Sequence, residues 1–282
     1  FGAKHAATQT NDFSYDGLRR AVREAEALAK LAPDDPESMP ELGAQQYAPV
    51  DGWFESTAAL SASDRARAAL TALEPARQAG DLAAAGFLIT SASQAAVGNN
   101  AGLFAYHRTT NANYTLTVRT SDGTGSGWAG ADHPDWTQLD TAAVARRAIE
   151  KARLSRNPVA VEPGRYTVIL EPTAVGNLVQ MLVGAMNARN ADEGRSFFTK
   201  QGGGNKIGMK VMDERVTLVS DPLDPDVGAN TFAPDGLPLR RTVWIENGVV
   251  KNLAYDRYWA QKQGKEANSG GGGGGFGGGG GG

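Results

Sequence analysis

Three histidines are the residues in this sequence best suited to metal binding or acid–base chemistry. His5, His107 and His133 lie far apart in the chain, and no two have the i, i+4 spacing of a metal-binding helix. There is no cysteine, which excludes disulfides, thiolate metal ligands and a cysteine nucleophile. An exposed or hydrogen-bonded imidazole is therefore the favoured state of each histidine, with a functional role as the alternative.

Aspartates are concentrated in one proline-rich stretch. Asp221, Asp224, Asp226 and Asp235 could together bind calcium or a basic peptide segment. Prolines beside or near three of them favour rigid turns over a cation site. The stretch does not fit an EF-hand, because no glycine follows at the required place and no glutamate ends the loop.

The remaining candidates lie in the last third of the chain. Ser196 and Ser220 lack the G-x-S-x-G context of a hydrolase nucleophile. The glycine-rich stretch 202–206 lacks phosphate-loop spacing and a following helix, so it is interpreted as a mobile loop beside a cleft. Arg240 and Arg241 begin an expected strand, and strand alternation sends only one of them into a cleft.

The elements that position these residues follow from hydrophobic periodicity and turn chemistry. Apolar residues at helical spacing predict amphipathic helices over 15–31, 61–80 and 140–156. Ser14 or Asp16 can cap the first and Ser63 or Asp64 the second, which Gly80 should end. A strand is predicted over 83–97 and one or two strands over 103–120, after a tight turn at 98–102.

A second domain is expected after residue 160. It should begin with a strand over 165–172 and a helix from Thr173, and continue mainly as short strands. Asn247 and Gly248 predict a tight hairpin, and a short helix over 255–266 should follow. The predicted class is α+β: an N-terminal α/β domain with helices on a sheet and a mostly β C-terminal domain, expected to be incomplete. The expected ranges are 1–160, 161–267 and a glycine-rich tail or placeholder at 268–282.

Composition limits the possible functions. The 282 residues are 41% hydrophobic and 21% charged, enough to form a core, and a net charge of -3 disfavours direct nucleic-acid binding. No apolar run long enough for a membrane span and no signal peptide are evident, which predicts a soluble, cytoplasmic protein. A start at Phe1 and a terminal run of glycines suggest that part of the native sequence is missing or substituted.

Several segments, in a fixed order along nearly the whole chain, resemble one protein family. The most specific is FAPDGLPLRRTVWIENGVV, in which an acidic-Gly-x-Pro turn leads into two arginines and a hairpin. Others are QAAVGNNAG, GRYTVILEP and GRSFF. Together they are similar to the TldD/PmbA family, also called TldD/TldE, which includes modulators of DNA gyrase and peptidase subunits.

The resemblance implies where a catalytic motif would lie. Catalytic members of that family carry H-E-x-x-x-H on a helix, and that helix follows the strand that corresponds to TVILEP in this chain. Two imidazoles bind zinc there and the glutamate activates water. In this chain the positions of the motif's first histidine, glutamate and second histidine correspond approximately to Val179, Gln180 and Gly184. There is no histidine after His133. Apolar residues in this helix have the spacing of an ordinary core stripe: Val175, Leu178, Val179, Leu182 and Met186.

The resemblance implies a metal-free, TldE-like subunit of a heteromeric peptidase, with no catalytic residue or cofactor of its own. Zinc would belong to a TldD-like partner, and this chain would help form a chamber for short or unfolded peptides. Two alternatives remain: a stand-alone peptide-binding or assembly module forming a homo-oligomer, and a metallopeptidase whose ligands lie outside this sequence. The expected substrate or partner contacts are Ser196, Asn205, Asp235, Arg240 and Arg241.

Overall fold

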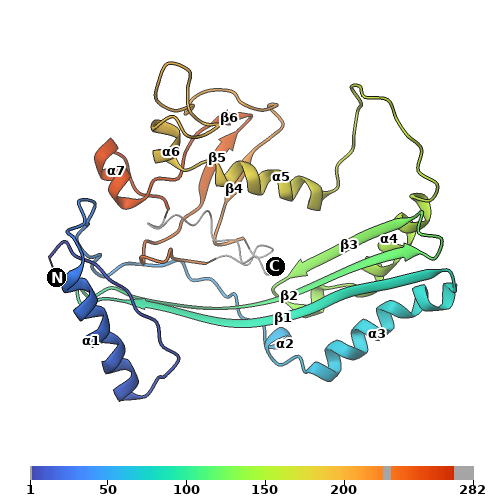
Figure 1. The fold of residues 1–282 in the computed structure, drawn as a ribbon, viewed down its shortest axis with the longest axis horizontal. Coiled ribbons are helices and arrows are strands. Elements are labelled where there is room, and N and C mark those ends of the chain that lie inside the picture. Colours follow the sequence, from blue (N-terminus) through green and yellow to red (C-terminus); the bar gives the residue numbers. More distant parts are fainter. Residues whose placement is uncertain (1, 225–229, 270–282) are drawn as a thin grey trace.

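The structure, a computed structural model, describes residues 2–224 and 230–269. Asp226 and all but two residues of the expected 268–282 tail therefore lie outside the described residues. Helices and antiparallel sheets are combined, which confirms the α+β class. Figure 1 shows a long sheet with its helices and, above it, a smaller group of elements from the second half of the chain.

The sheet has the order β1 (Leu82–Gly98), β2 (Phe104–Thr120) and β3 (Ser126–His133), all antiparallel. The predicted hairpin is confirmed, with Gly98 paired to Phe104 across the turn. The third strand was not predicted, because its glycines and alanines give no β-branched alternation. His133 ends β3 half-buried, and its Nδ1 accepts a hydrogen bond from the Asp135 amide at 2.9 Å, which is the hydrogen-bonded state expected from the sequence.

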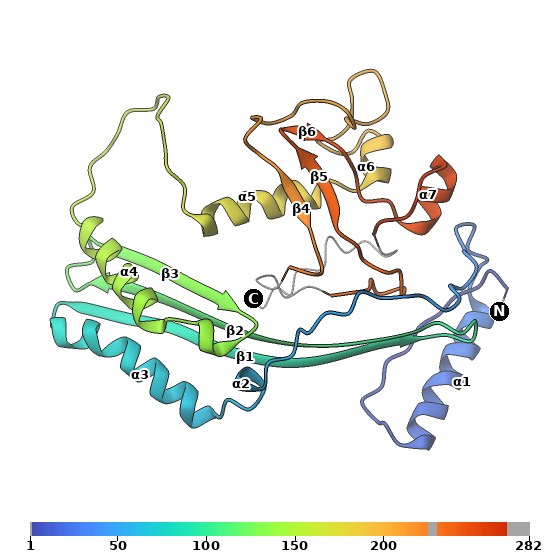
Figure 2. The ribbon, with the colours of Figure 1, turned by 180° about the vertical axis from the view of Figure 1, so that it is seen from behind.

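Helices α3 (Ala62–Ala79) and α4 (Thr141–Leu154) cover one face of this sheet and pack against each other. Figure 2 shows them beside the strands that they cover. Small side chains make close packing possible: Ala145, Ala148 and Ala152 are fully buried. A Cβ on Gly127 of β3 would stand 2.2 Å from the Ala148 carbonyl oxygen, so glycine permits this approach.

Capping residues set the helix starts largely as predicted. In α1 (Tyr15–Leu31), the Gly17 amide donates to Ser14 Oγ, and Asp140 caps α4 in the same way. The cap of α3 is Ser61, not Ser63 or Asp64, because Ser61 and Asp64 form a reciprocal capping box. Gly80 ends α3 with a left-handed φ of 75°, as expected.

Two short helices connect the sheet to the segment 32–54, which we call the N-terminal connection. These are α2 (Glu55–Ala58) and the 3₁₀ helix η1 (Trp136–Gln138). The buried Thr57 hydroxyl donates to the Pro134 carbonyl oxygen at 2.8 Å and accepts from the Trp136 amide at 2.7 Å. One side chain thereby joins the two segments.

The second group has its own core around Phe198, Trp244, Ile245 and Trp259. The predicted hairpin is confirmed, with Asn247 and Gly248 both at positive φ. The expected final helix is also present. The elements of this group are α5 (Pro172–Gly184), α6 (Ala188–Asp192), β4 (Leu218–Ser220), β5 (Thr242–Glu246), β6 (Val249–Val250) and α7 (Arg257–Gln263).

The strand predicted over 165–172 is wrong. Residues 165–171 form no strand, and α5 begins at Pro172. Figure 1 shows them in the long connection between α4 and α5. A β pattern becomes a strand only when another strand supplies hydrogen bonds, and none in the described part of the chain does so. The division near residue 160 stays a prediction. No helix in 2–224 or 230–269 is long and apolar enough to cross a membrane.

Tyr114 provides a test of the sheet core. Its side chain is 2% exposed, and its hydroxyl has no hydrogen-bond partner among the described residues. Burial also raises the pKa of this phenol. Replacing Tyr114 with Phe removes an unsatisfied polar group while keeping the ring, so we expect the free energy of unfolding to rise by about 1 kcal/mol.

Urea unfolding monitored by circular dichroism measures this change. Tyr114→Ala is the matched comparison, and it should cost about 3–5 kcal/mol through the lost ring. A loss of stability in Tyr114→Phe would show that the hydroxyl is satisfied and would contradict the assignment.

Candidate functional site

Helix α5 carries the positions at which the sequence resemblance places a metal motif. Val179 is half-buried, Gln180 is exposed, and Gly184 has open space where a side chain would stand. These residues do not fit zinc, since valine and glycine offer no side-chain donor and a glutamine amide is not among the usual ligands. Among the residues that the structure describes, no group of three or more His, Cys, Asp or Glu could hold a metal ion.

The apolar stripe of α5 is not an ordinary core stripe, which corrects the sequence-based expectation. Met186 is fully buried and Leu182 packs on the second core, but Val175 and Leu178 are 42% and 57% exposed. Only the C-terminal end of the helix is anchored. The rest of the stripe stays exposed because the described elements pack only against that end.

Exposed apolar side chains also occur in the connection that precedes α5. We refer to residues 159–181 as the exposed apolar run, and Ile169 in it is 98% exposed. Contiguous exposed apolar patches often mark interaction sites, so this run is a candidate contact surface. Its exposed large side chains are Val159, Val161, Tyr166, Val168, Ile169, Leu170, Val175, Leu178 and Met181.

Ser196 and Asn205 lie in one loop, where their side chains hold the local backbone. Ser196 Oγ donates to the Ala185 carbonyl oxygen and accepts from the Phe198 amide. Asn205 Nδ2 donates to Asp192 Oδ1 at 2.7 Å, and its Oδ1 accepts from the Ile207 amide. These bonds fix the loop, and a role of Ser196 or Asn205 in contacting substrate stays a prediction.

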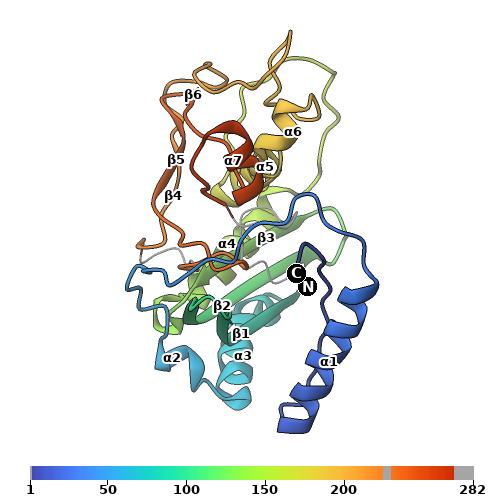
Figure 3. The ribbon, with the colours of Figure 1, turned by 90° about the vertical axis from the view of Figure 1, so that its left-hand side faces the viewer.

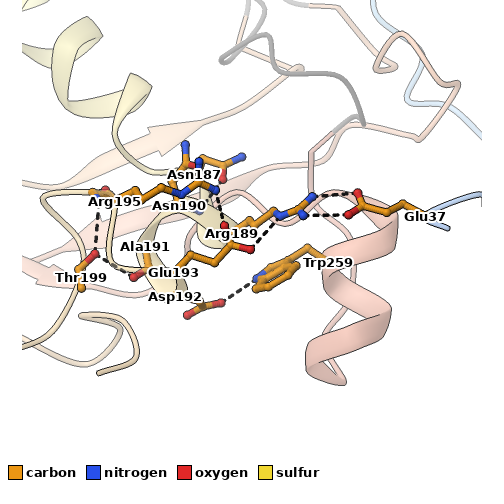
Figure 4. A network of polar contacts seen from close by, with 11 residues as sticks. Glu37, Asn187, Arg189, Asn190, Ala191, Asp192, Glu193, Arg195, Thr199 and Trp259 are labelled. Atoms are coloured by element: carbon orange, nitrogen blue, oxygen red, sulfur yellow. Dashed lines mark hydrogen bonds and ion pairs between the residues drawn. The ribbon is translucent and has the colours of Figure 1, made fainter. Parts of the chain in front are cut away.

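A polar network beside this loop joins distant parts of the chain (Figure 4). Both terminal nitrogens of Arg189 donate to the Glu37 carboxylate at 2.8 Å, and its Nε donates to Glu193 at 3.1 Å. The guanidinium also stacks on Trp259, whose indole nitrogen donates to Asp192 at 2.7 Å. Sequence reasoning missed Arg189, because a partner 152 positions away leaves no local pattern.

The predicted arginines lie at a hollow of about 180 Å³, which we call the arginine hollow. Both arginines line it, so the expectation that only one could do so is wrong. The reason is that β5 begins at Thr242, and strand alternation does not yet apply to the two preceding residues. The lining residues are Gln46, Ala48, Pro222, Leu223, Pro238, Leu239, Arg240 and Arg241.

The two arginines differ in their charge environment. Arg241 Nε lies 3.4 Å from Asp221 Oδ2, which offsets one positive charge. The Arg240 guanidinium has no hydrogen bond or ion pair within the described ranges, and its side chain is exposed. Asp235 does not line the hollow: its carboxylate accepts from the Leu237 amide at 3.2 Å and holds the neighbouring turn.

Tyr47 fixes one wall of the arginine hollow. Its hydroxyl donates to the Gly236 carbonyl oxygen at 2.8 Å, and its ring meets Phe232 edge-on with centroids 5.6 Å apart. Burial, and then the negative charge of Asp235, raise the pKa of Tyr47. Figure 3 shows the segment that contains Tyr47 crossing between the sheet and the second group.

Comparison with known proteins gives two family matches. The models described as the PmbA/TldA metallopeptidase central domain and C-terminal domain match residues 54–156 and 163–278. A metalloprotease of Methanothermobacter thermautotrophicus is 29% identical over 130 residues, which are 45% of this chain and 27% of that protein.

Solved structures show the same fold over most of the chain. TldE from Thermococcus kodakarensis matches with a TM-score of 0.77 and 21% identity, over 92% of this chain and 59% of that one. A putative modulator of DNA gyrase from Bacteroides thetaiotaomicron gives 0.82 and 18%, over 95% and 62%. The chain thus spans about three fifths of these proteins and about a quarter of the metalloprotease.

Gly236 tests the contact that holds this turn. It has a φ of +83°, and a Cβ there would stand 2.6 Å from Cδ2 of the buried Leu103. We expect Gly236→Ala to destabilise the fold through backbone strain plus overpacking of about 1–3 kcal/mol. Gly202→Ala is the control, because Gly202 also has positive φ but nothing within 4 Å of a Cβ.

The difference between the two variants in urea unfolding isolates the packing contribution. Gly236→Ala combined with Leu103→Ala should cost less than the sum of the two single variants, since the shortened side chain leaves room for the added methyl group. Equal effects of Gly236→Ala and Gly202→Ala would show that the contact with Leu103 carries no strain.

Glu193 gives a pH-dependent test of the Arg189 network. Hydrogen bonds, first from Arg189 and then from Arg195, lower its pKa below the ordinary 4.5. A lowered carboxyl pKa contributes stability that is present above 4.5 and is lost as pH falls through the folded value. Arg189→Gln should raise the Glu193 pKa partway toward 4.5 and weaken this acid dependence.

Carbon-detected NMR titration of the carboxyl groups measures the shift. Glu74 is the internal control, because Arg77 and Gln78 lower its pKa independently of Arg189. If Glu193 titrates unchanged in Arg189→Gln, the network does not hold its charge in solution.

Proposed function

This chain belongs to the PmbA/TldD metallopeptidase family, and on that premise we propose that it is a subunit of a peptidase complex that does not itself hold the metal. The observation that carries the proposal is the side-chain set at the motif positions of α5. Val179, Gln180 and Gly184 provide neither metal ligands nor a carboxylate base. Zinc and the water-activating glutamate would belong to a TldD-like partner chain.

The exposed apolar run supports an assembly role. Ile169 and Leu178 are largely exposed, and contact of such apolar side chains with water is unfavourable. Contact with another polypeptide removes that surface from water. In the proposed complex, this chain contributes the wall of a peptide chamber and positions substrate, while the partner performs the hydrolysis.

A reconstitution assay tests this proposal. The full chain is purified and mixed with a TldD-like chain from the same host that carries H-E-x-x-x-H, and hydrolysis of a fluorogenic peptide is followed with and without a chelator. We expect no hydrolysis by this chain alone and chelator-sensitive hydrolysis by the mixture, at a rate above that of the partner alone. A partner whose motif glutamate is changed to glutamine is the control, and it should assemble without activity.

Other outcomes favour the alternatives. Chelator-sensitive hydrolysis by the isolated chain would refute the proposal and favour a metallopeptidase whose ligands lie elsewhere in the native protein. A stable homo-oligomer that ignores the partner and binds peptide would favour a stand-alone binding module. Size-exclusion chromatography with light scattering separates this second outcome from complex formation.

A further inference from the structure

We infer that the arginine hollow binds the C-terminal carboxylate of a peptide whose last side chain is apolar. The inference rests on the proposed function, which makes peptides the substrate class. It adds which end of the peptide is held and which residues of this chain hold it.

Charge selects an anion for this hollow. Asp221 offsets the charge of Arg241 at 3.4 Å, while Arg240 has no ionic partner among the described residues. Counting the charges of residues 2–224 and 230–269 alone, one uncompensated positive charge therefore faces the hollow. A guanidinium presents two parallel N–H donors that match the two oxygens of a carboxylate, so a bidentate pair is the favoured complex.

The apolar lining of the hollow determines which terminal side chain the bound peptide can have. Pro222, Leu223, Pro238 and Leu239 make much of the lining apolar. An apolar terminal side chain gains free energy by leaving water against such walls, whereas a charged one would lose hydration without a partner. The volume of about 180 Å³ is far above the roughly 10–15 Å³ that one water needs, which leaves room for a terminal group.

The hollow is held in shape before any ligand arrives. Asp221 accepts from the Leu223 amide at 3.0 Å and also pairs with Arg241, so one carboxylate fixes two walls. The Leu239 amide donates to the Thr231 carbonyl oxygen at 2.9 Å, which fixes a third. Such preorganisation reduces the ordering cost of binding.

Gln46 and Ala48 supply the remaining wall, and Tyr47 between them holds it in place. Its side chain turns toward Gly236 and Phe232, while its neighbours Gln46 and Ala48 line the hollow. In extended backbone, adjacent residues point to opposite sides, which accounts for this division. The Gln46 amide is therefore available to a bound carboxylate or to the last peptide group.

Direct binding to the isolated full chain tests the inference. The probes are fluorescein-labelled hexapeptides with leucine at the end, one with a free carboxylate and one with a C-terminal amide, measured by fluorescence anisotropy at low salt. We expect the free acid to bind about tenfold tighter than the amide. A third probe, an amide with aspartate as its last residue, separates a chain terminus from an acidic side chain, and it should bind no better than the leucine amide.

Variants assign the effect to the hollow. Arg240→Gln should abolish the preference for the free acid, and Arg240→Lys should retain part of it because the charge remains without the bidentate geometry. Arg23→Gln, on the exposed face of α1, is the matched control and should keep the full preference. Circular dichroism confirms folding, and Arg240 is suited to substitution because its side chain is exposed and supports no described contact.

The inference is overturned if acid and amide bind equally, if neither binds, or if Arg240→Gln keeps the preference. Tight binding of the aspartate amide would replace a terminal carboxylate with an acidic side chain as the ligand. These outcomes are separate from failure of the proposed function, because the reconstitution assay reports assembly and hydrolysis and does not depend on how a peptide end is held.

Discussion

The packing of Leu103 against Gly236 is the constraint on which the arrangement of this molecule depends. Leu103 follows the turn of the long hairpin and is 3% exposed, and a residue larger than glycine at 236 would overlap it. This contact places the turn of the second half directly on the sheet of the first. Tyr47 then closes over the same turn through Gly236 and Phe232. The position of Gln46 and Ala48, which line one side of the arginine hollow, therefore depends on how two halves of the chain meet.

A second contact between the two halves is polar and lies away from the contact of Leu103 with Gly236. Arg189 near the start of α6 holds Glu37 in the N-terminal connection, so this connection is fixed at both Glu37 and Tyr47. The segment between the helices α1 and α2 has little secondary structure, yet it forms a strip between the sheet and the second group (Figure 3). The two contacts differ in physical kind, one apolar and one ionic, and so respond differently to packing changes and to pH.

Local chemistry was predictable from the sequence, whereas contacts between distant segments were not. Ser14, Asp140 and Gly80 act within one helical turn of the residues that they cap, and the Asn247–Gly248 hairpin needs only its own backbone angles. The strand expected at 165–172 failed because a strand requires a partner, which no local pattern guarantees. The sequence singled out both arginines, and their role in contacting substrate stays a prediction. Their shared hollow escaped prediction because it depends on where β5 begins and on segment 46–48, nearly two hundred residues earlier.

Helix α5 is the element on which the proposed assembly role depends. A helix of 13 residues with two internal or terminal glycines has little stability of its own, since short helices are marginal in water and glycine disfavours the helical state. Tertiary contacts anchor it only near Leu182 and Met186. In the proposed complex, a partner that covers the remaining apolar stripe would stabilise the helix, so ordering of the helix and association would be coupled. Among the motif positions, Val179 has a side chain without donors and is half-buried at the edge of that same stripe, whereas Gln180 is exposed.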